Sequence, residues 1–530
     1  MATAVPCWPQ RDSAHLLVSG AQMAALEQQL FASGLPVEAL MEKAALAVAE
    51  AIQADWGERL HSQGAVVLAG PGHNGGDGLV IARELHLAGI RTRIWSPFEC
   101  HKPLTEAHLR HAQWLGIERL QQAPDPAGAA VWIDALFGIG QRRRLEQTLA
   151  ALLLERARQR PGALVAVDVP SGLDDTSGET LGPVCACAAV TYAIGLCKQG
   201  LAQDPALPQV GRLRRIDLGL PAPLLQALPA GTPLWLQECD AKTAPWPTLS
   251  AIAGKYERGR VLVIAGSARY RGAALLALLG ASASGAGSLR AALAAPMAEN
   301  LWQWLPHAVL QRPLECDASG SLLLGGLQPA DLERLDAIVL GPGIGVLDAD
   351  ALSQPEAAAE QRSWLLLQRF PGLLLLDADG LNRSNVSWLQ GRVGPTWITP
   401  HRGELQHLWP ALAQLPALDA AALAASESGA VVLLKGARSV IAAPDGQRWQ
   451  LAQATPAAAR AGLGDVLAGY AAARGAMALA AGQPCQSAWL AAAALDHALA
   501  GTHCERRTGP GGCTPAAIAT TLAKRPWQSC

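Results

Sequence analysis

Short, continuous apolar runs that end in glycine-rich turns recur along the chain, and they constrain its fold more than any other feature. Stretches with helical patterning separate these runs, which lie at residues 65–69, 131–133, 164–169, 260–265, 337–340, 373–376, 396–399 and 431–434. Continuous apolar runs, unlike alternating ones, are typical of strands that are buried on both faces of a parallel sheet. Strands separated by helices form right-handed βαβ crossovers, so the sequence predicts an α/β fold.

A proline-rich segment divides these runs into two groups. Residues 219–250 contain six prolines, a density that disfavours regular structure. A chain of 530 residues is long enough for two large α/β domains. We therefore expect one domain over residues 1–228 and a second domain over residues 229–530.

Charge and composition exclude several classes of function. The 42 Lys and Arg nearly balance the 44 Asp and Glu, for a net charge of −2. Proteins that bind nucleic acids through phosphates carry a concentrated surplus of basic residues instead. The N-terminus lacks the basic and apolar regions of a signal peptide, and the uncharged stretch at residues 273–289, which is rich in small residues, suits a buried helix better than a membrane span. We expect a cytoplasmic protein that binds neither nucleic acid nor membrane.

A polar, glycine-rich turn follows the first apolar run. The segment GPGHNGGDG at residues 70–78 precedes a stretch with apolar helical patterning. Free backbone N–H groups and the positive end of the helix dipole meet at such a junction, and glycine allows an anionic ligand to approach closely. A plain turn capped by Asn74 and Asp77 would use the same residue types. The acids that end the next two runs favour a binding site.

Those two acids are Asp134, within IDALFGIG, and Asp168, within VDVPSGLD. In an open parallel sheet, ligands bind at the carboxyl ends of the strands. Asn74, Asp134 and Ser171 could meet there as oxygen ligands for a monovalent cation. Asp168 would then be free for proton transfer.

These motifs, together with LMEKAA at residues 40–45, resemble the epimerase domain of the bifunctional NAD(P)H-hydrate repair enzymes. That domain has a Rossmann-like three-layer fold and interconverts the R and S forms of hydrated nicotinamide dinucleotides. The resemblance implies K⁺ held by Asn74, Asp134 and Ser171, with Asp168 as the acid or base and Lys198 as a second candidate. The substrate contacts that it implies are His73, Asn74, Gly75, Gly76, Asp77, Gly138, Ile139, Gly140, Gln141, Arg142, Arg143, Arg144 and Asp168.

In the second half, the most informative motif is the last one. Gly462 and Gly464 precede Asp465 at the start of an apolar helical stretch. Backbone amides there could stabilise charge on a transferred phosphoryl group, and Asp465 could accept the proton of the attacking hydroxyl. An Asp that only compensates the helix dipole would look the same. His401 could bind substrate and Lys435 could reach a nucleotide phosphate, although either residue type is also common on a plain surface. No P-loop motif occurs in the sequence.

The segments GSARYRGA, GPGIG, DADGL, TPHRGE, KGARS and GLGD, in this order, resemble the ribokinase-like NAD(P)H-hydrate dehydratase domain, a three-layer α/β fold. Bacterial members of that family use ADP, with Mg²⁺, to phosphorylate the substrate hydroxyl and then eliminate phosphate. The resemblance implies hydrate-binding positions at Ala273, Gly345, His401 and Asp465. The nucleotide-phosphate positions that it implies are Lys435, Gly436, Ala437, Arg438, Ser439 and Gly464.

One departure matters for the second half: the family's GGSGD is AGLGD at residues 461–465. Alanine at position 461 is unfavourable only if that residue needs a positive φ. Loss of a serine donor could cost about 3 kcal/mol of transition-state stabilisation.

The resemblance predicts an enzyme that epimerises NADHX and NADPHX and dehydrates the S form to NAD(P)H with ADP, giving AMP and phosphate. One alternative is a ribokinase-like small-molecule kinase with an accessory N-terminal domain, which would make a stable phosphorylated product. Another is a dinucleotide-binding protein with a decayed dehydratase site. The retained Asp465, His401 and Lys435 oppose a decayed site, and the epimerase-like first half opposes the kinase. Alanine-rich helices with few charges lead us to expect a homo-oligomer.

Overall fold

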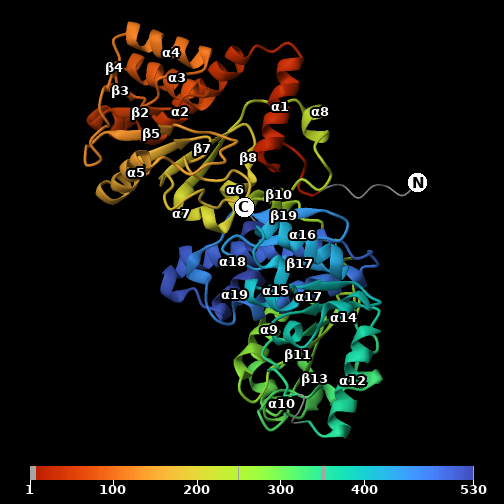
Figure 1. The fold of residues 1–530 in the computed structure, drawn as a ribbon. Helices are drawn as coiled ribbons and strands as arrows, with labels where there is room; N and C mark the ends of the chain where they lie inside the picture. Colours follow the sequence, from red (N-terminus) through yellow and green to blue (C-terminus); the bar gives the residue numbers. More distant parts are fainter. Residues whose placement is uncertain (1–7, 249, 349–351, 529–530) are drawn as a thin grey trace. The chain divides into compact units, whose positions relative to one another are not determined.

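The computed structural model describes residues 8–248, 250–348 and 352–528, which form two compact units (Figure 1). Arg11–Pro233 make up the first unit, and the rest of the described chain makes up the second. The chain passes from the first unit to the second between residues 233 and 234. Residues 8–10 belong to the second unit, because Trp8 donates its indole N–H to the carbonyl of Asp240 at 3.2 Å and accepts the indole N–H of Trp449 at 2.8 Å.

The first unit is built on a seven-stranded parallel sheet with the strand order β4-β3-β2-β5-β6-β7-β9. Its strands are β2 (Ala65–Ala69), β3 (Thr92–Trp95), β4 (Glu118–Arg119), β5 (Val131–Ala135), β6 (Leu164–Val167), β7 (Val190–Ile194) and β9 (Arg212–Ile216), and a separate pair is formed by β1 (Leu17–Val18) and β8 (Cys197–Lys198). The three predicted apolar runs are the adjacent central strands β2, β5 and β6, which confirms the parallel α/β prediction for this half.

Helices cover both faces of this sheet. They are α1 (Gly20–Ala32), α2 (Val37–Gln63), α3 (His73–Leu87), α4 (Pro103–Trp114), α5 (Gln147–Gln159), α6 (Gln199–Ala202), α7 (Leu207–Val210) and α8 (Ala222–Gln226), with a 3₁₀ turn at Asp204–Ala206. Leu153 of α5 shares a buried cluster with Val66 and Trp132. Gly78 of α3 packs on Val67, whose side chain points to the opposite face because neighbours on a strand alternate. The result is a three-layer arrangement.

The second unit contains a ten-stranded sheet, ordered β10-β19-β18-β17-β16-β15-β14-β11-β12-β13. Its strands are β10 (Leu234–Leu236), β11 (Arg260–Ala265), β12 (Ser288–Ala294), β13 (Ala308–Leu314), β14 (Ala337–Leu340), β15 (Leu373–Leu376), β16 (Thr396–Ile398), β17 (Val431–Leu434), β18 (Val440–Ala442) and β19 (Arg448–Leu451). The five predicted runs are β11, β14, β15, β16 and β17, which lie side by side and parallel, as predicted. Strand β18 pairs antiparallel with both of its neighbours and was not predicted.

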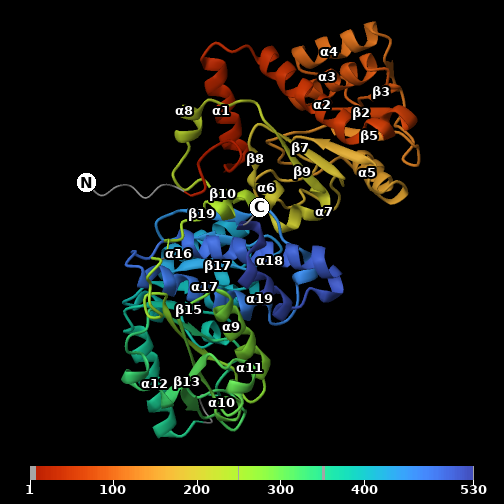
Figure 2. The same ribbon diagram turned by 180° about the vertical axis from the view of Figure 1, so that it is seen from behind.

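The helices of this unit include a tightly packed pair, α9 and α17 (Figure 2). The full set is α9 (Arg271–Ala283), α10 (Ala295–Ala298), α11 (Leu301–Trp304), α12 (Gln354–Gln368), α13 (Asp379–Asn382), α14 (Val386–Gln390), α15 (Arg402–Leu408), α16 (Ala417–Ser428), α17 (Leu463–Ala480), α18 (Ala488–Gly512) and α19 (Pro515–Lys524), with 3₁₀ turns at Glu238–Lys242, Leu324–Gly326, Pro329–Asp331, Pro410–Leu412, Pro456–Ala458 and Pro526–Gln528. A Cβ atom on Gly469 of α17 would lie 1.8 Å from the carbonyl oxygen of Ala277 in α9. The two helices can approach this closely only because glycine lacks that atom.

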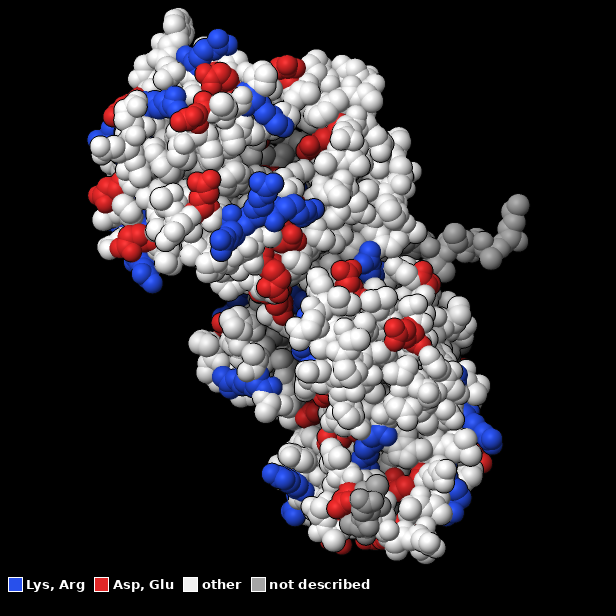
Figure 3. Space-filling view, in the orientation of Figure 1, with Lys and Arg blue, Asp and Glu red and all other residues white. Residues whose placement is uncertain are grey.

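Two sequence expectations need correction here. The uncharged stretch 273–289 is not one helix: α9 ends at Ala283 and β12 begins at Ser288. The proline-rich segment 219–250 contains short regular elements, namely α8, β10 and a 3₁₀ turn. Within the described ranges, no helix has the length and apolar character needed to cross a membrane. On the face shown in Figure 3, acidic and basic side chains are interspersed and most of the surface is uncharged.

Two candidate active sites at the strand ends

A cavity of about 400 Å³ lies at the carboxyl ends of β2, β5 and β6 in the first unit. Its lining residues are Glu27, Pro71, Gly72, His73, Asn74, Asp77, Lys102, Leu136, Phe137, Gly138, Ile139, Gly140, Gln141, Asp168, Ile194 and Lys198. Most of the predicted substrate contacts line this cavity. Because they come from three neighbouring strand ends, the cavity matches the expected position of a ligand in an open parallel sheet.

Gly75 and Gly76 are predicted substrate contacts that lie outside this lining. Both are buried in the first turn of α3. A Cβ on Gly75 would lie 1.9 Å from the carbonyl oxygen of Gly70, and one on Gly76 would lie 2.8 Å from the sulfur of Met41. The structure therefore uses these two glycines to seat the helix against the rest of the unit.

Asp168 is the most constrained acid of the cavity. It follows β6 with a φ of +67°, in the left-handed region that non-glycine residues rarely adopt. Its Oδ1 accepts the N–H of Ile194 at 3.1 Å and pairs with Nζ of Lys198, which also donates to the carbonyl of Ile194 at 2.7 Å. Both Asp168 and Lys198 are buried. The Oδ2 atom of Asp168 has no partner among the residues described, so it is available to a ligand.

Two further carboxyl groups, Glu27 and Asp77, line the same cavity. Burial raises the pKa of Asp77 well above its usual value, and the nearby Asp168 and Glu27 raise it further. Burial and then Asp168 raise the pKa of Glu27, while Lys198 opposes that shift. Sequence reasoning missed Glu27, which belongs to no motif. One feature of the sequence could have indicated it: Glu27 lies four positions after Met23, so this charged residue falls on the face of α1 that is otherwise buried.

The predicted cation ligands Asp134 and Ser171 are in direct contact. Ser171 donates its hydroxyl to Oδ1 of Asp134 at 2.7 Å and its N–H to Oδ2 at 2.8 Å. Both residues are fully buried, and burial raises the pKa of Asp134 to about 6 against the opposing hydrogen bonds from Ser171. The third ligand, Asn74, packs beside Gly138, where a Cβ would lie 3.2 Å from the Asn74 side chain. Its buried amide nitrogen has no partner among the described residues.

Gln141 ties the loop after β5 to the loop after β6. Its Nε2 donates to the carbonyl of Gly138 at 3.0 Å, and its Oε1 accepts the N–H of Gly172 at 2.7 Å. The predicted contacts Gly138, Ile139, Gly140 and Gln141 therefore form one braced wall of the cavity.

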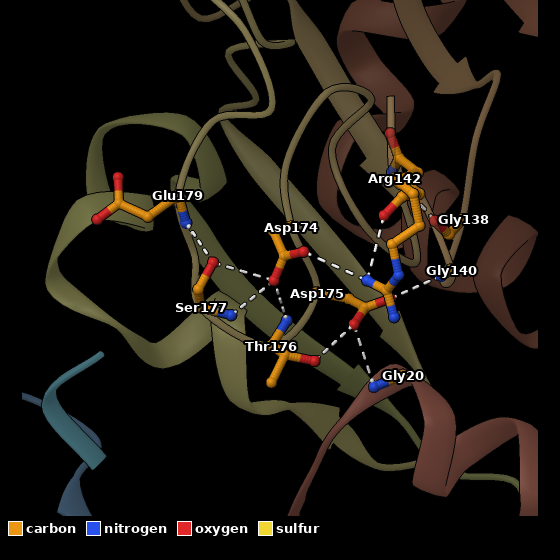
Figure 4. A network of polar contacts seen from close by, with 10 residues as sticks. Gly20, Gly138, Gly140, Arg142, Asp174, Asp175, Thr176, Ser177 and Glu179 are labelled. Carbon is orange, nitrogen blue, oxygen red and sulfur yellow. Dashed lines mark hydrogen bonds and ion pairs between the residues drawn. The ribbon is translucent and has the colours of Figure 1, made fainter. Parts of the chain in front are cut away.

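Asp174 and Asp175 brace the same loop without lining the cavity, and Figure 4 shows their polar contacts. Oδ2 of Asp175 accepts the N–H of Gly140 at 2.6 Å, and its Oδ1 accepts the N–H of Gly20 at 3.2 Å. Asp174 pairs with Arg142 at 3.3 Å. Sequence reasoning assigned neither acid a role, because their partners lie in other segments of the chain.

The predicted arginines of this loop face a second, larger cavity of about 1,030 Å³. It shares Pro71, Phe137, Gly140 and Gln141 with the first cavity, so the two adjoin. Its other lining residues are Trp95, Pro97, Phe98, Glu99, Cys100, Ala123, Arg142, Arg143, Arg144, Leu145, Glu146, Thr148, Leu149 and Leu152. The three arginines are exposed and would meet a ligand that extends from one cavity into the other.

In the second unit, Lys435 occupies the carboxyl end of β17. Its Nζ lies 2.7 Å from Oδ1 of Asp377, which follows β15, and 3.7 Å from Oε2 of Glu404. Thr399, which follows β16, donates its hydroxyl to the same Asp377 oxygen at 2.8 Å. Burial alone would lower the pKa of Lys435, but Asp377 and Glu404 outweigh burial and raise it. Lys435 therefore carries its charge at neutral pH.

Asp465 lies in the first turn of α17, beside this pair. A Cβ on Gly464 would lie 3.4 Å from Nζ of Lys435 and 3.6 Å from Oδ2 of Asp377. Burial, and then the charge of Asp377, raise the pKa of Asp465 to about 7, while Lys435 opposes the shift. Gly462 has a φ of +90°, whereas Ala461 lies outside the left-handed region. Alanine at position 461 therefore imposes no backbone strain.

His401 caps helix α15. Its Nδ1 accepts the N–H groups of Gly403 at 3.0 Å and Glu404 at 3.2 Å, and the N–H of His401 donates to Glu404 in return at 2.7 Å. Glu404 thus completes the capping box at the start of α15. The imidazole remains exposed beside the Lys435 strand end, where the two backbones form a bridge.

The remaining predicted positions lie in loops and helix starts of the second unit. Gly345 has a φ of +77° and donates its N–H to Oδ2 of Asp379 at 2.8 Å. Ala273 lies in the first turn of α9, next to the GPGIG turn at Gly343. Gly436, Ala437, Arg438 and Ser439 form the turn between β17 and β18.

Comparisons with known proteins agree with both halves. A family model described as YjeF-related protein N-terminus matches residues 37–200, and one described as NAD(P)H-hydrate dehydratase matches residues 261–524. The bifunctional NAD(P)H-hydrate repair enzyme Nnr of Gloeobacter violaceus is 42% identical over 463 residues, covering 86% of this chain and 87% of that protein. The enzyme of the same name from Synechocystis sp. is 38% identical over 459 residues, covering 86% and 84%.

Among solved structures, the chain is similar to an ADP/ATP-dependent NAD(P)H-hydrate dehydratase from Bacillus subtilis, co-crystallised with ATP and Mg²⁺. That structure is 24% identical, has a TM-score of 0.46, and covers 55% of this chain and 96% of its own. The two curated relatives extend over most of both chains and include both units. The chain therefore belongs to the family of bifunctional NAD(P)H-hydrate repair enzymes.

Proposed function

We propose that the first unit interconverts the R and S forms of NADHX and NADPHX, and that the second unit dehydrates the S form to NAD(P)H at the expense of ADP, giving AMP and phosphate. The observation that carries this proposal is that each unit places a group suited to proton transfer at its parallel strand ends: Asp168 in the first and Asp465 in the second. Membership of the family supports both activities in one chain. The proposed functional domains keep the predicted division, residues 1–228 and 229–530.

In the first unit, Asp168 is the proposed acid or base. Lys198 and the amide of Ile194 hold one carboxylate oxygen, which leaves the other free to exchange a proton with a ligand. Lys198 places a positive charge directly beside this carboxyl group. The three exposed arginines of the adjoining cavity supply positive charge for the phosphates of a dinucleotide.

K⁺ is the proposed cofactor of this unit, with Asn74, Asp134 and Ser171 as its ligands. All three offer oxygen atoms, which are the ligands that hard cations prefer. A half-turn of the Asn74 amide puts its oxygen in the place of the buried, unpartnered nitrogen. The residue set therefore fits a monovalent cation, which would neutralise the buried Asp134 and hold the loops around it in place.

In the second unit, Lys435 and the start of α17 are proposed to bind the transferred phosphoryl group. The lysine is charged, and the first-turn amides of a helix are donors without carbonyl partners inside that helix. Asp465 would accept the proton of the substrate hydroxyl as it attacks phosphorus. Loss of phosphate from the product then restores the reduced nicotinamide.

ADP, with Mg²⁺, is the proposed phosphoryl donor. Asp377 and Glu404 are the carboxylates beside Lys435, and they offer the oxygen ligands that Mg²⁺ takes together with phosphate oxygens. A homo-oligomer and a cytoplasmic location remain predictions from the sequence. Light scattering on the purified chain tests the first of these, and cell fractionation tests the second.

A small-molecule kinase with an accessory domain is the competing function. It would use the same nucleotide site but would release a stable phosphate ester. The acid, lysine and cation-ligand set of the first unit has no role in that function. A decayed dehydratase is the other alternative, and the unstrained Ala461 argues against it, because the altered loop keeps a glycine at position 462, where φ is positive.

Separate assays of each step test the proposal. The R form of NADHX is incubated without nucleotide and followed by chromatography, and ADP is then added to the S form while absorbance of the reduced nicotinamide is recorded. Asp168→Asn should stop only the first reaction, and Asp465→Asn should stop only the second. Loss of both reactions in one folded variant, or of neither, contradicts the assignment of one activity to each unit.

A further inference from the structure

The cavity of the first unit contains more carboxyl groups than its buried lysine can neutralise. Lys198 is paired with Asp168. Asp77 of α3 and Glu27 of α1 line the same cavity, and neither side chain has a hydrogen bond or ion pair to any other described residue. Because like charges in a shared, poorly solvated site cannot all ionise, one of these carboxyls holds a proton at neutral pH.

The surroundings favour Asp77 as the protonated group. Asp168 and Glu27 face it and oppose its ionisation, whereas Lys198 favours ionisation but is already bound to Asp168. His73 and Lys102 are the other titratable groups on the cavity wall, and burial and Lys102 lower the pKa of His73. The cavity thus presents a carboxyl on α3 that tends to keep its proton, together with the carboxyl after β6 that is paired with Lys198.

We propose that Asp77 and Asp168 form a two-carboxyl acid–base pair, and that Glu27 is a positioning residue that keeps the proton on Asp77. This inference rests on the proposed epimerase function. Asp77 touches the substrate as a catalytic residue, whereas Glu27 acts through the charge that it places beside Asp77. Neither role follows from the glycine-rich motif, in which Asp77 is only a substrate contact.

The reaction balances with these two groups. Hydration of the dihydronicotinamide ring places the hydroxyl on a carbon bonded to the ring nitrogen. Asp77 gives its proton to that hydroxyl, the C–O bond breaks, and water leaves as the nitrogen lone pair forms a cationic C=N bond. Water then attacks the opposite face, a new C–O bond forms, and the released proton passes to Oδ2 of Asp168. Proton exchange with solvent restores the starting state, and the reverse direction uses the two groups in exchanged roles.

The pH profile of epimerisation tests the role of Glu27. Glu27→Gln removes a like charge, so Asp77 should lose its proton at a lower pH and the alkaline limb should move down by about one pH unit. A structural role would instead reduce the rate at every pH without moving the limb. Glu50→Gln, on the exposed face of α2, is the matched control and should leave the profile unchanged. An unmoved limb in an active Glu27→Gln variant overturns this role.

Asp77→Asn tests the acid itself and should lower the epimerisation rate by at least about a hundredfold. Retained dehydration of the S form by the same sample shows that the variant is folded. Product formed in ¹⁸O-labelled water should carry one solvent oxygen, and unlabelled epimerised product overturns the hydroxyl-loss step. A wild-type chain that does not epimerise overturns the proposed function together with this inference. Wild-type epimerisation with an unimpaired Asp77→Asn variant overturns the inference alone.

Discussion

Replacing Asp465 by Asn should make the second unit more stable while it removes dehydratase activity. The pKa of Asp465 is raised from its ordinary 3.8 to about 7, mainly by burial. A shift of about three pH units at 1.36 kcal/mol each corresponds to at most about 4 kcal/mol of cost for holding the charge in the folded state. Asn has nearly the same shape as the neutral acid and avoids that cost. The native chain thus gives up stability to keep a base near neutral pH.

The sign of the effect depends on pH. Below pH 3.8 the carboxyl is neutral in both the folded and the unfolded chain, so the substitution gains nothing. Between 3.8 and about 7 the unfolded chain releases its proton first, so the stability of the native protein falls as pH rises. Above about pH 7 the carboxyl is ionised in both the folded and the unfolded chain, so the full cost of holding its charge in the folded state applies. The gain from Asp465→Asn should therefore grow across this window and then level off.

Scanning calorimetry of the full chain between pH 5 and pH 8 measures this difference. The transition of the second unit should rise by up to about 8 °C at pH 8 and by less at pH 5. The transition of the first unit should not move, which makes it an internal control. The dehydratase rate of the native chain should fall about tenfold for each pH unit below about 7, because the ionised carboxylate is the base. A variant that is destabilised at pH 8, or a shift that does not depend on pH, refutes the reasoning.

Three other predictions address separate parts of the chain. Asp134→Ala should abolish K⁺-dependent epimerisation while NADHX dehydration continues, and an unchanged epimerisation rate in K⁺ and in Na⁺ contradicts the cation site. Leu463→Ser restores a hydroxyl beside the phosphoryl site and should speed dehydration by up to about a hundredfold in single-turnover assays; a slower variant contradicts that role. Gly469→Ala places a Cβ 1.8 Å from the Ala277 carbonyl oxygen and should destabilise the chain by about 1–3 kcal/mol in urea titrations. Gly57→Ala, at an open helical position, is its control and should be neutral or stabilising.

The central strands of both sheets could be predicted because their buried position requires a continuous run of apolar residues. Strands such as β2 and β15 are buried on both faces, so every side chain is apolar. Strand β9 lies at the edge of the first sheet and has the sequence RLRRI. It is not a continuous apolar run, so it was not predicted. The antiparallel β18 is short and joins β17 through the turn that was interpreted as a phosphate loop.

The candidate sites could be predicted where a residue suited to catalysis or binding lies at the end of a strand. Asp134 and Asp168 lie at adjacent parallel strand ends, so the topology brings them to one edge. Glu27 reaches the same cavity from a helix far earlier in the chain, and only the fold brings it there. The glycines of GPGHNGGDG show a second limit of prediction from the sequence. A residue without a side chain can serve a ligand or a helix contact, and the structure shows tight helix packing at Gly75 and Gly76, while their contact with substrate stays a prediction.

The most direct test of the bifunctional assignment uses the purified chain and a mixture of R and S NADHX, with ADP or ATP in parallel reactions. Absorbance of the reduced nicotinamide is followed until it stops rising. We expect complete recovery of both epimers with ADP, because the first unit feeds the S form to the second. Recovery of the S fraction alone would contradict the epimerase assignment. No recovery with either nucleotide would contradict the dehydratase assignment and would mean that the AGLGD loop has silenced the second unit.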